Sequence, residues 1–326
     1  MSKHFNSVVK LNSFARQVRN TLVELLVVAM AVAFAAPAFA QIPVVNQCPA
    51  PQVISKPGNY VLTTDGCSIV ISASNVHLNT AGHNVYTVLN ALMIDDGLSN
   101  ISIDGGGSLY GGTGVVIGAS RNITLNNLSL SGNVSYTTGI AVELNGAKGV
   151  TVTNSRIESD GCPGGGPAIS GTVDNGLFSH NTITGAECGP VGGIRVDGTN
   201  IVIRDNTINA QNDEGASFYA ISVTSDTLIS DNTITLTRPE FVAASEIVGI
   251  DFTGHSNLVK GNTIQSNANT NSYGILAAQG AIGNAITNNN VMGNQYDLFE
   301  SNGPPCVNIW RHNKFQTSGG AVACIK

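Results

Sequence analysis

The stretch NIVIRDNTINA, residues 200–210, decides the fold because it is the clearest copy of a unit that recurs along most of the chain. Copies begin every 22 to 30 residues, at Asn75, Asn100, Asn122, Gly149, Asn175, Asn200, Asp226, Ser256, Gly283 and Val307. Self-similarity with a period of roughly 20–50 residues is typical of stacked repeat architectures. The chain is therefore predicted to be a solenoid.

Apolar positions within each copy indicate strands. The third and eighth residues after the start, Ile203 and Ile208 in this copy, are aliphatic or aromatic along the chain. Frequent β-branched residues and apolar positions two apart favour strands over helices. A further strand follows each copy, as in GIAVE at residues 139–143 and GIRVD at 193–197. Two or three short strands in each turn of about 26 residues predict a parallel β-helix.

An asparagine lies six residues after the start of most copies. It shares a strand face with the apolar eighth residue, so its amide is expected to point inward. A buried amide without hydrogen bonds costs roughly 1–3 kcal/mol, and stacked amides can bond to one another. We therefore predict a structural ladder in preference to a binding site. Its members would be Asn181, Asn206, Asn232, Asn262, Asn289 and Asn313.

These N-x-[ITV] units and paired G-I-x-V strands resemble the right-handed parallel β-helix superfamily, the pectin-lyase-like group, over residues 75–315. The resemblance implies an all-β, single-stranded, right-handed parallel β-helix solenoid of about ten coils, capped at both ends. It also implies carbohydrate chemistry, because much of the superfamily comprises polysaccharide lyases, hydrolases and epimerases. The catalytic signatures of those enzymes, such as R-x-P-x-x-R of pectate lyases, are absent from this sequence. Fold analogy alone therefore assigns no catalytic residue.

The first forty residues do not fit the repeat. Basic residues precede an apolar run at residues 22–34, and an A-x-A pattern ends at Ala40. These features predict a signal peptide over residues 1–40, with an uncleaved anchor as the alternative. The protein is then expected to be secreted, periplasmic or on the cell surface. Pro-rich residues 41–74 would form an N-terminal cap, and residues 75–326 the β-helix with a C-terminal cap.

The net charge of the chain limits the classes of partner that it can bind. Only 11% of residues are charged, and the net charge is −6. Residues 1–40 hold four of the 15 basic and one of the 21 acidic residues, so the remaining chain has a net charge of −9. Phosphate backbones need clustered cations, which excludes a nucleic-acid partner. No other apolar run is long enough to cross a membrane, and a monomer is expected.

The six cysteines all follow residue 40, and an even count in an exported chain predicts disulfides. The expected pairs are Cys48–Cys67, Cys162–Cys188 and Cys306–Cys324. The middle pair lies 13 residues after the start of two adjacent repeats, roughly 4.8 Å apart and within disulfide reach. The other two pairs would pin the ends. Metal ligation is the alternative, but C-x-x-C and H-x-x-x-H spacings are absent.

Long loops are expected on one turn of successive coils, where solenoids often bind ligands. They span residues 159–167, 185–192, 210–217 and 236–246. Their acidic residues are candidate substrate contacts, and solvated surface charge is the alternative. The contacts would be Asp160, Glu187, Asp213 and Glu214, with Glu158, Glu240 and Glu246 on the same side. Calcium would suit such carboxylates, but no ligand loop of defined spacing occurs, so no metal site is predicted.

Outward positions of the further strand supply the candidate catalytic residues. They are Glu143, Arg195, Asp197 and Asp251. If Ile140, Ile194 and Ile250 face the core, Glu143 and Asp197 share a column two coils apart, about 9.6 Å. Arg195 and Asp251 share the adjacent column. Paired carboxyls about 6.5–9.5 Å apart serve inverting glycosidases, and an arginine would serve uronate cleavage. Salt bridges between coils are the alternative.

A third column holds His180, Asp205, Asp231 and His312, five residues into the repeat. A cation or sugar site would use such residues, but tight turns also favour Asp and Asn, and the turn explanation is preferred. Two functions remain open. The protein either acts on or binds a polysaccharide, as a lyase or hydrolase of unknown substrate, or is a non-catalytic surface or matrix protein for adhesion or scaffolding.

Overall fold

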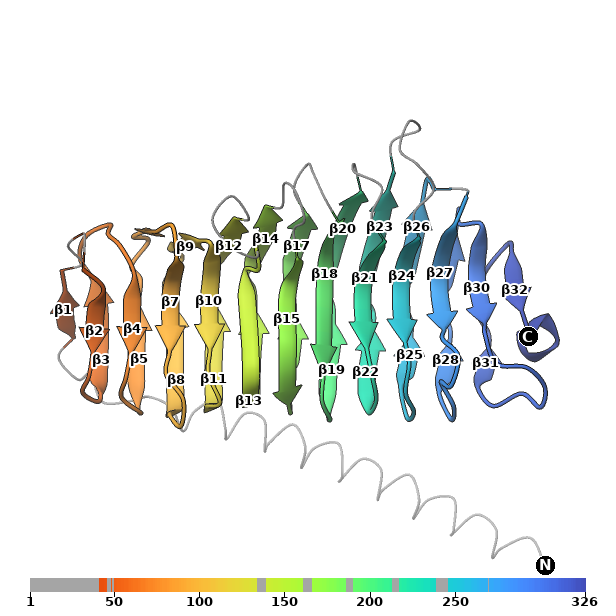
Figure 1. The fold of residues 1–326 in the computed structure, drawn as a ribbon, viewed down its shortest axis with the longest axis horizontal. Coiled ribbons are helices and arrows are strands. Elements are labelled where there is room, and N and C mark those ends of the chain that lie inside the picture. The colour runs from red at the N-terminus through yellow and green to blue at the C-terminus, as the bar shows by residue number, and fades with distance from the viewer. Residues whose placement is uncertain are drawn as a thin grey trace, which may run out of the picture. The chain divides into compact units, whose positions relative to one another are not determined.

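The computed structural model describes residues 41–326 except residues 46–47, 49, 134–138, 161–165, 186–189, 213–216, 239–245 and 269. The described residues lie in one compact unit, Gln41–Lys326. They form short strands stacked along a solenoid, with one 3-10 turn, η1 (Val322–Cys324), near the C-terminus (Figure 1). None of the described residues forms a helix that could span a membrane.

Three parallel sheets run along the solenoid, and the chain visits each in turn. The first sheet contains β2 (Gln52–Ile54), β4 (Ile69–Ile71), β7 (Asn90–Ile94), β10 (Thr113–Ile117), β13 (Val142–Thr153), β15 (Pro167–Asp174), β18 (Pro190–Asp197), β21 (Phe218–Val223), β24 (Ile247–Phe252), β27 (Ser272–Ala277), β30 (Tyr296–Glu300) and β32 (Ser318–Gly320).

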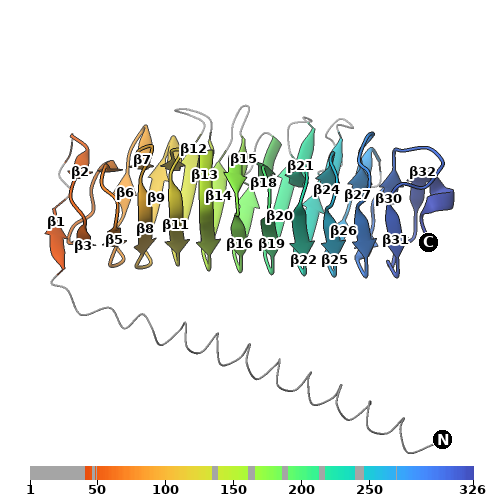
Figure 2. The same cartoon turned by 90° about the horizontal axis from the view of Figure 1, so that it is seen from below.

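The second sheet contains β1 (Ile42–Val44), β3 (Gly58–Leu62), β5 (Val76–Asn79), β8 (Ser99–Asp104), β11 (Arg121–Asn126), the second half of β13, β16 (Leu177–Ser179), β19 (Ile201–Arg204), β22 (Thr227–Ser230), β25 (Leu258–Lys260), β28 (Ala285–Thr287) and β31 (Ile309–Arg311). Figure 2 shows these strands side by side along the solenoid.

The third sheet contains β6 (Val85–Tyr86), β9 (Ser108–Gly111), β12 (Ser129–Asn133), β14 (Arg156–Asp160), β17 (Thr182–Gly185), β20 (Thr207–Asn212), β23 (Thr233–Thr237), β26 (Thr263–Ser266) and β29 (Asn290–Met292). The described chain thus has nine coils with a strand in every sheet, slightly fewer than the ten predicted. In the next coil the third strand is reduced to a bridge between Lys314 and Asn290. The predicted parallel β-helix is confirmed.

The predicted apolar columns form the core. Ile203 and Ile208 of the defining repeat are buried, and Ile203 pairs with Phe178 below and Ile229 above. Each of these side chains therefore packs on its counterpart in the next coil. Residues 41–74, predicted as a cap, supply strands β1–β4, which pair with the coils that follow.

Tight turns explain which residue begins each repeat. Asn75, Asn100, Asn122 and Asn200 all have positive φ, between 54° and 59°. Asparagine tolerates this left-handed conformation better than most residues, because its short polar side chain bonds locally. The column of His180, Asp205, Asp231 and His312 lies at the next turn, with φ of 55° to 57°. Its residue types therefore follow from turn geometry.

The inward asparagines form a continuous hydrogen-bonded ladder from Asn181 to Asn313. In each rung the side-chain oxygen accepts from the backbone and side-chain amides of the asparagine one coil earlier. Asn232, for example, accepts both bonds from Asn206 at 3.0 Å and donates to Ile203 O at 2.9 Å and Asn262 Oδ1 at 3.0 Å. The buried amides are thus satisfied without water.

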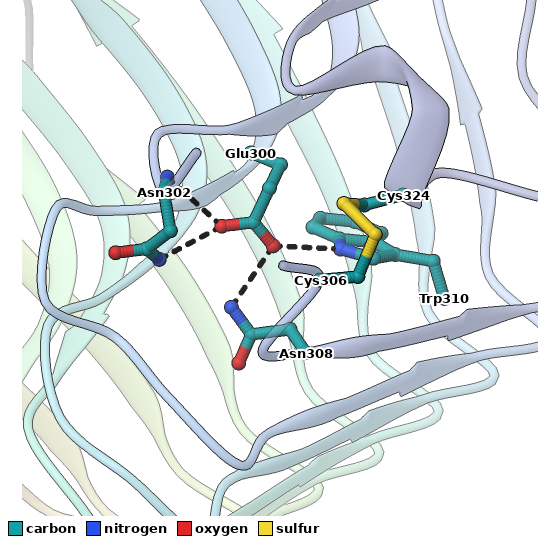
Figure 3. Close-up of a disulfide and its surroundings, with 6 residues drawn as sticks. All are labelled: Glu300, Asn302, Cys306, Asn308, Trp310 and Cys324. Atoms are coloured by element: carbon teal, nitrogen blue, oxygen red, sulfur yellow. Dashed lines mark hydrogen bonds between the residues drawn. A yellow bond between two sulfur atoms is a disulfide. The ribbon is translucent and has the colours of Figure 1, made fainter. Parts of the chain in front are cut away.

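A second ladder, which sequence reasoning missed, ends at a buried carboxylate. Asn257, Asn284 and Asn308 stack at the turn between the first and second sheets. Asn308 Nδ2 then donates to Glu300 Oε2 at 2.9 Å, and Trp310 Nε1 donates to the same oxygen at 3.0 Å. Asn302 donates twice to Glu300 Oε1 (Figure 3). Glu300 is only 1% exposed, so these four bonds compensate its burial.

Disulfides pin both ends of the solenoid. Cys48 bonds Cys67 in the first coils, and Cys306 bonds Cys324 beside Trp310 in the last (Figure 3). These are two of the three predicted pairs. Cys162 and Cys188 lie outside the described residues. Each bridge closes a loop in the first or last of the described coils and restricts the unfolded chain there.

Candidate functional site

The outer face of the first sheet changes character along the solenoid. One outward column can be followed in register through ten adjacent strands, from β7 to β32, with apolar residues at either end and polar residues between. In order it holds Met93, Val116, Glu143, Ser170, Arg195, Ser222, Asp251, Leu276, Phe299 and Gly319. Its charged residues are confined to the middle coils, which makes that section the candidate site.

The register corrects the predicted columns. Glu143 lies in the column of Arg195, two coils away, and does not share a column with Asp197. Asp197 instead pairs with Thr172, which pairs with Asn145. The prediction was wrong because it aligned Ile140 with Ile194, whereas the core position in β13 is Val142. Ile140 precedes that strand and is only partly buried. The predicted alignment of β13 differs from the observed register by two residues. Glu143 therefore still faces outward, but its neighbours in the adjacent coils are different from those predicted.

Asp251 is the most unusual of the predicted residues. It lies on β24, where all six residues are buried, and it is 7% exposed, whereas Arg195 and Asp197 are exposed and Glu143 is half-buried. Burial raises the pKa of Asp251 to about 6, against a hydrogen bond donated by Ser222 Oγ at 3.3 Å. The charge of Glu246 raises this pKa further, and that of Arg195 lowers it. Asp251 therefore keeps its proton to a higher pH than an ordinary aspartate, up to about pH 6.

Glu246 is held beside Asp251 by a tyrosine. Tyr219, on the neighbouring strand β21, donates its hydroxyl to Glu246 Oε1 at 2.9 Å, and Phe218 N donates to Glu246 O at 2.8 Å. Burial raises the pKa of Tyr219 to about 12, and the hydrogen bond and charge of Glu246 add to this effect. The tyrosine thus stays protonated and keeps one carboxylate oxygen occupied. The other oxygen has no hydrogen bond to the described chain.

A second outward column adds aromatic rings. Tyr219, Val248, Tyr273 and Tyr296 follow one another in register on β21, β24, β27 and β30. The rings of Tyr273 and Tyr296 stack with centroids 5.8 Å apart. Phe299 meets both edge-on, at 5.1 Å and 5.2 Å. These three half-buried rings form a cluster directly C-terminal to Asp251.

Sequence reasoning found only part of this arrangement. Arg195 and Asp251 were selected from strand alternation, and Glu246 from its loop. Tyr219 and Ser222 were missed, although FYAISV at residues 218–223 and SYGILA at 272–277 share an aromatic residue just before the repeated strand. Among the predicted substrate contacts, the side chain of Asp160 and residues Glu187, Asp213 and Glu214 lie outside the described part of the chain.

No group of three His, Cys, Asp or Glu residues that could hold a metal ion is found within the described ranges. The site combines a protonatable carboxyl, a second carboxylate on a tyrosine, and an arginine two coils from Asp251. Such pairs are used for general acid–base catalysis.

Comparison with known protein families identifies the family to which the chain belongs. The model of a right-handed β-helix region matches residues 92–257, just over half of the chain, so the protein belongs to the right-handed β-helix family. This confirms the predicted superfamily and handedness. No curated protein sequence matches the chain.

Solved structures match the chain at low sequence identity and with TM-scores below 0.5. The Dettilon tailspike protein gp208 is 17% identical with a TM-score of 0.48, and the match covers 78% of this chain and 52% of that one. The present chain thus spans about half of the tailspike's length. DFA-IIIase from Arthrobacter chlorophenolicus A6, as the mutant C387A, is 10% identical with a TM-score of 0.44, over 82% and 75% of the two chains. The same enzyme without its lid, in complex with GF2, is 13% identical with a TM-score of 0.42, over 79% and 70%.

Proposed function

We propose that this protein is exported from the cell and hydrolyses a polysaccharide bound along the outer face of the first sheet. The observation that carries the proposal is Asp251, a carboxyl with a pKa of about 6, beside the tyrosine-bound carboxylate of Glu246. Two carboxyl groups in different protonation states are what glycoside hydrolysis requires. Export is supported by disulfides at both ends of the solenoid, which persist in oxidising compartments.

In the proposed mechanism Asp251 is the general acid. It donates its proton to the glycosidic oxygen as the bond to the anomeric carbon breaks, and becomes a carboxylate. The free oxygen of Glu246 accepts a proton from the water that attacks that carbon. Tyr219 is a positioning residue, since its hydrogen bond fixes Glu246. The two carboxyls exchange the proton through solvent and return to their starting states.

The polar column extends N-terminal to Asp251 through Ser222, Arg195, Ser170 and Glu143. Adjacent strands are about 4.8 Å apart, so these residues give hydrogen-bonding groups along one line of an extended chain. A linear glycan would thus lie parallel to the solenoid axis. Elimination at a uronate is less well supported, because it needs a cation at the sugar carboxylate, and Arg195 is two coils from Asp251.

The test is a panel of neutral and acidic polysaccharides incubated with the purified exported protein. We expect new reducing ends with one member and no rise in ultraviolet absorbance from unsaturated uronates. Asp251→Asn should lower turnover on the order of 10²–10⁴-fold with binding retained, because a general acid contributes about that much. Asp197→Asn, an exposed change in another column, is the control and should keep full turnover.

Three results would contradict the proposal. Unsaturated products would establish a lyase. Glycan binding without products from the wild type would favour the adhesion or scaffold function. Full turnover by Asp251→Asn would remove the assigned acid.

A further inference from the structure

The aromatic cluster next to Asp251 has no role in the core. The inward positions of β27 and β30 are Ile275 and Leu298, both fully buried, and they pack against the coils on either side. Tyr273, Tyr296 and Phe299 lie on the opposite face and remain partly exposed. Aromatic residues on an outer face offer a large apolar area at little cost in side-chain entropy.

Gly319, on β32, leaves space for the rings of Tyr296 and Phe299 to lie against the sheet. A Cβ at Gly319 would lie 2.6 Å from a Tyr296 ring carbon and 2.7 Å from a Phe299 ring carbon. Any larger residue would therefore push both rings away from the sheet surface. The rings cover β32 because Gly319 leaves room for them.

The charge around the cluster is negative. Burial raises the pKa of Tyr273, and the charge of Glu246 raises it further, which places a negative potential at the phenol. Neither outward column holds a lysine or arginine in the described strands β24, β27, β30 and β32. Arg238 lies outside these columns, and its guanidinium donates to Thr270 O at 2.6 Å. A carboxylate or sulfate group on a bound sugar would therefore meet the charge of Glu246 and no cation in either column.

We infer that Tyr273, Tyr296 and Phe299 form a subsite for a neutral sugar ring, so that the polysaccharide is neutral and its bound chain extends C-terminal to Asp251. The inference rests on the proposed function and names its substrate class. One C–H face of the sugar lies against the rings, as apolar faces of ligands do in aromatic-lined sites. The linkage to be cleaved then lies over Asp251, one coil from Tyr273.

The deciding experiment measures binding of neutral and uronate-containing polysaccharides to the wild type and to Tyr296→Leu. Leucine keeps apolar bulk but removes the ring face, and an unchanged melting temperature will show that the variant is folded. We expect the wild type to prefer a neutral glycan, with affinity insensitive to salt from about 0.05 to 0.5 M, since no charge pairs are made. Tyr296→Leu should bind it at least tenfold more weakly.

A matched control is provided by another tyrosine pair. Tyr86 and Tyr110 lie on the third sheet with centroids 5.9 Å apart, and Tyr86 is 52% exposed. Tyr86→Ala should leave glycan binding unchanged. An equal loss in this control would show that the effect of Tyr296→Leu is not specific to the cluster, and would overturn the subsite.

The remaining outcomes separate this inference from the proposed function. Normal binding by Tyr296→Leu, together with turnover lost in Asp251→Asn, would overturn the subsite and leave the hydrolase intact. Tighter binding of a uronan than of any neutral glycan would overturn the substrate class. Absence of binding and turnover with both kinds of glycan would overturn both proposals.

Discussion

At pH 8 the variant Asp251→Asn is expected to be more stable than the wild type by on the order of 3 kcal/mol. The folded-state pKa of Asp251, about 6, lies above the usual value of 3.8. Between these values the folded protein therefore binds more protons than the unfolded chain. Stability falls as pH rises through this window, and above pH 6 the full cost of the buried charge remains. Asparagine removes that charge and keeps a similar shape.

The measurement is chemical denaturation of both proteins at pH 4 and pH 8. At pH 4 the two free energies of unfolding should nearly coincide, because Asp251 is then largely protonated when folded. A difference in the free energy of unfolding that is present at pH 8 and absent at pH 4 would show that the ionised carboxylate of Asp251 destabilises the fold. Asp197→Asn should show no such difference, since Asp197 is exposed. Equal stability of Asp251→Asn and wild type at both pH values would refute the raised pKa.

Asn232→Ala is expected to destabilise the solenoid by about 3–5 kcal/mol. Asn232 is 1% exposed and makes four side-chain hydrogen bonds to Asn206, Ile203 and Asn262. Alanine would remove the partner of the Asn206 backbone N–H, one of the two acceptors of Asn206 Nδ2, and the side-chain donor to the Ile203 carbonyl. Each such group costs roughly 1–3 kcal/mol, and the small cavity adds to the loss.

Urea denaturation gives the difference in free energy of unfolding. The matched control is Asn209→Ala in the coil before it, which replaces an exposed asparagine of β20 and should change stability by less than about 0.5 kcal/mol. If both substitutions had the same small effect, the ladder would not contribute to stability.

The fold could be predicted from the sequence because each coil repeats the same inward residues. Ile203 and Ile208 recur at fixed offsets, so their columns are visible without any knowledge of register. Asn206 and Asn232 recur in the same way. The starting asparagines recur too, and their positive φ explains why a residue that tolerates the left-handed conformation stands at most of these positions.

The site could be predicted only in part, because outward residues do not repeat. Which outward residues are neighbours depends on the register between strands. In β13 the register depends on where the strand begins after the preceding loop, and the repeat pattern does not fix that position. Val142 occupies the core position that was expected for Ile140. Glu143 therefore lies in the column of Arg195 and not in that of Asp197. The link between Tyr219 and Glu246 joins two coils across a loop. No sequence spacing reveals such a contact.

The central claim is that Asp251, on the face proposed to bind the glycan, has a pKa of about 6, well above that of an ordinary aspartate. Titration of aspartate side-chain carboxyl ¹³C resonances by NMR tests it directly and needs no substrate. We predict one resonance with a midpoint near pH 6, which disappears in Asp251→Asn. Midpoints below about 4.5 for every aspartate would contradict the claim, because Asp251 would then titrate like an ordinary surface carboxylate.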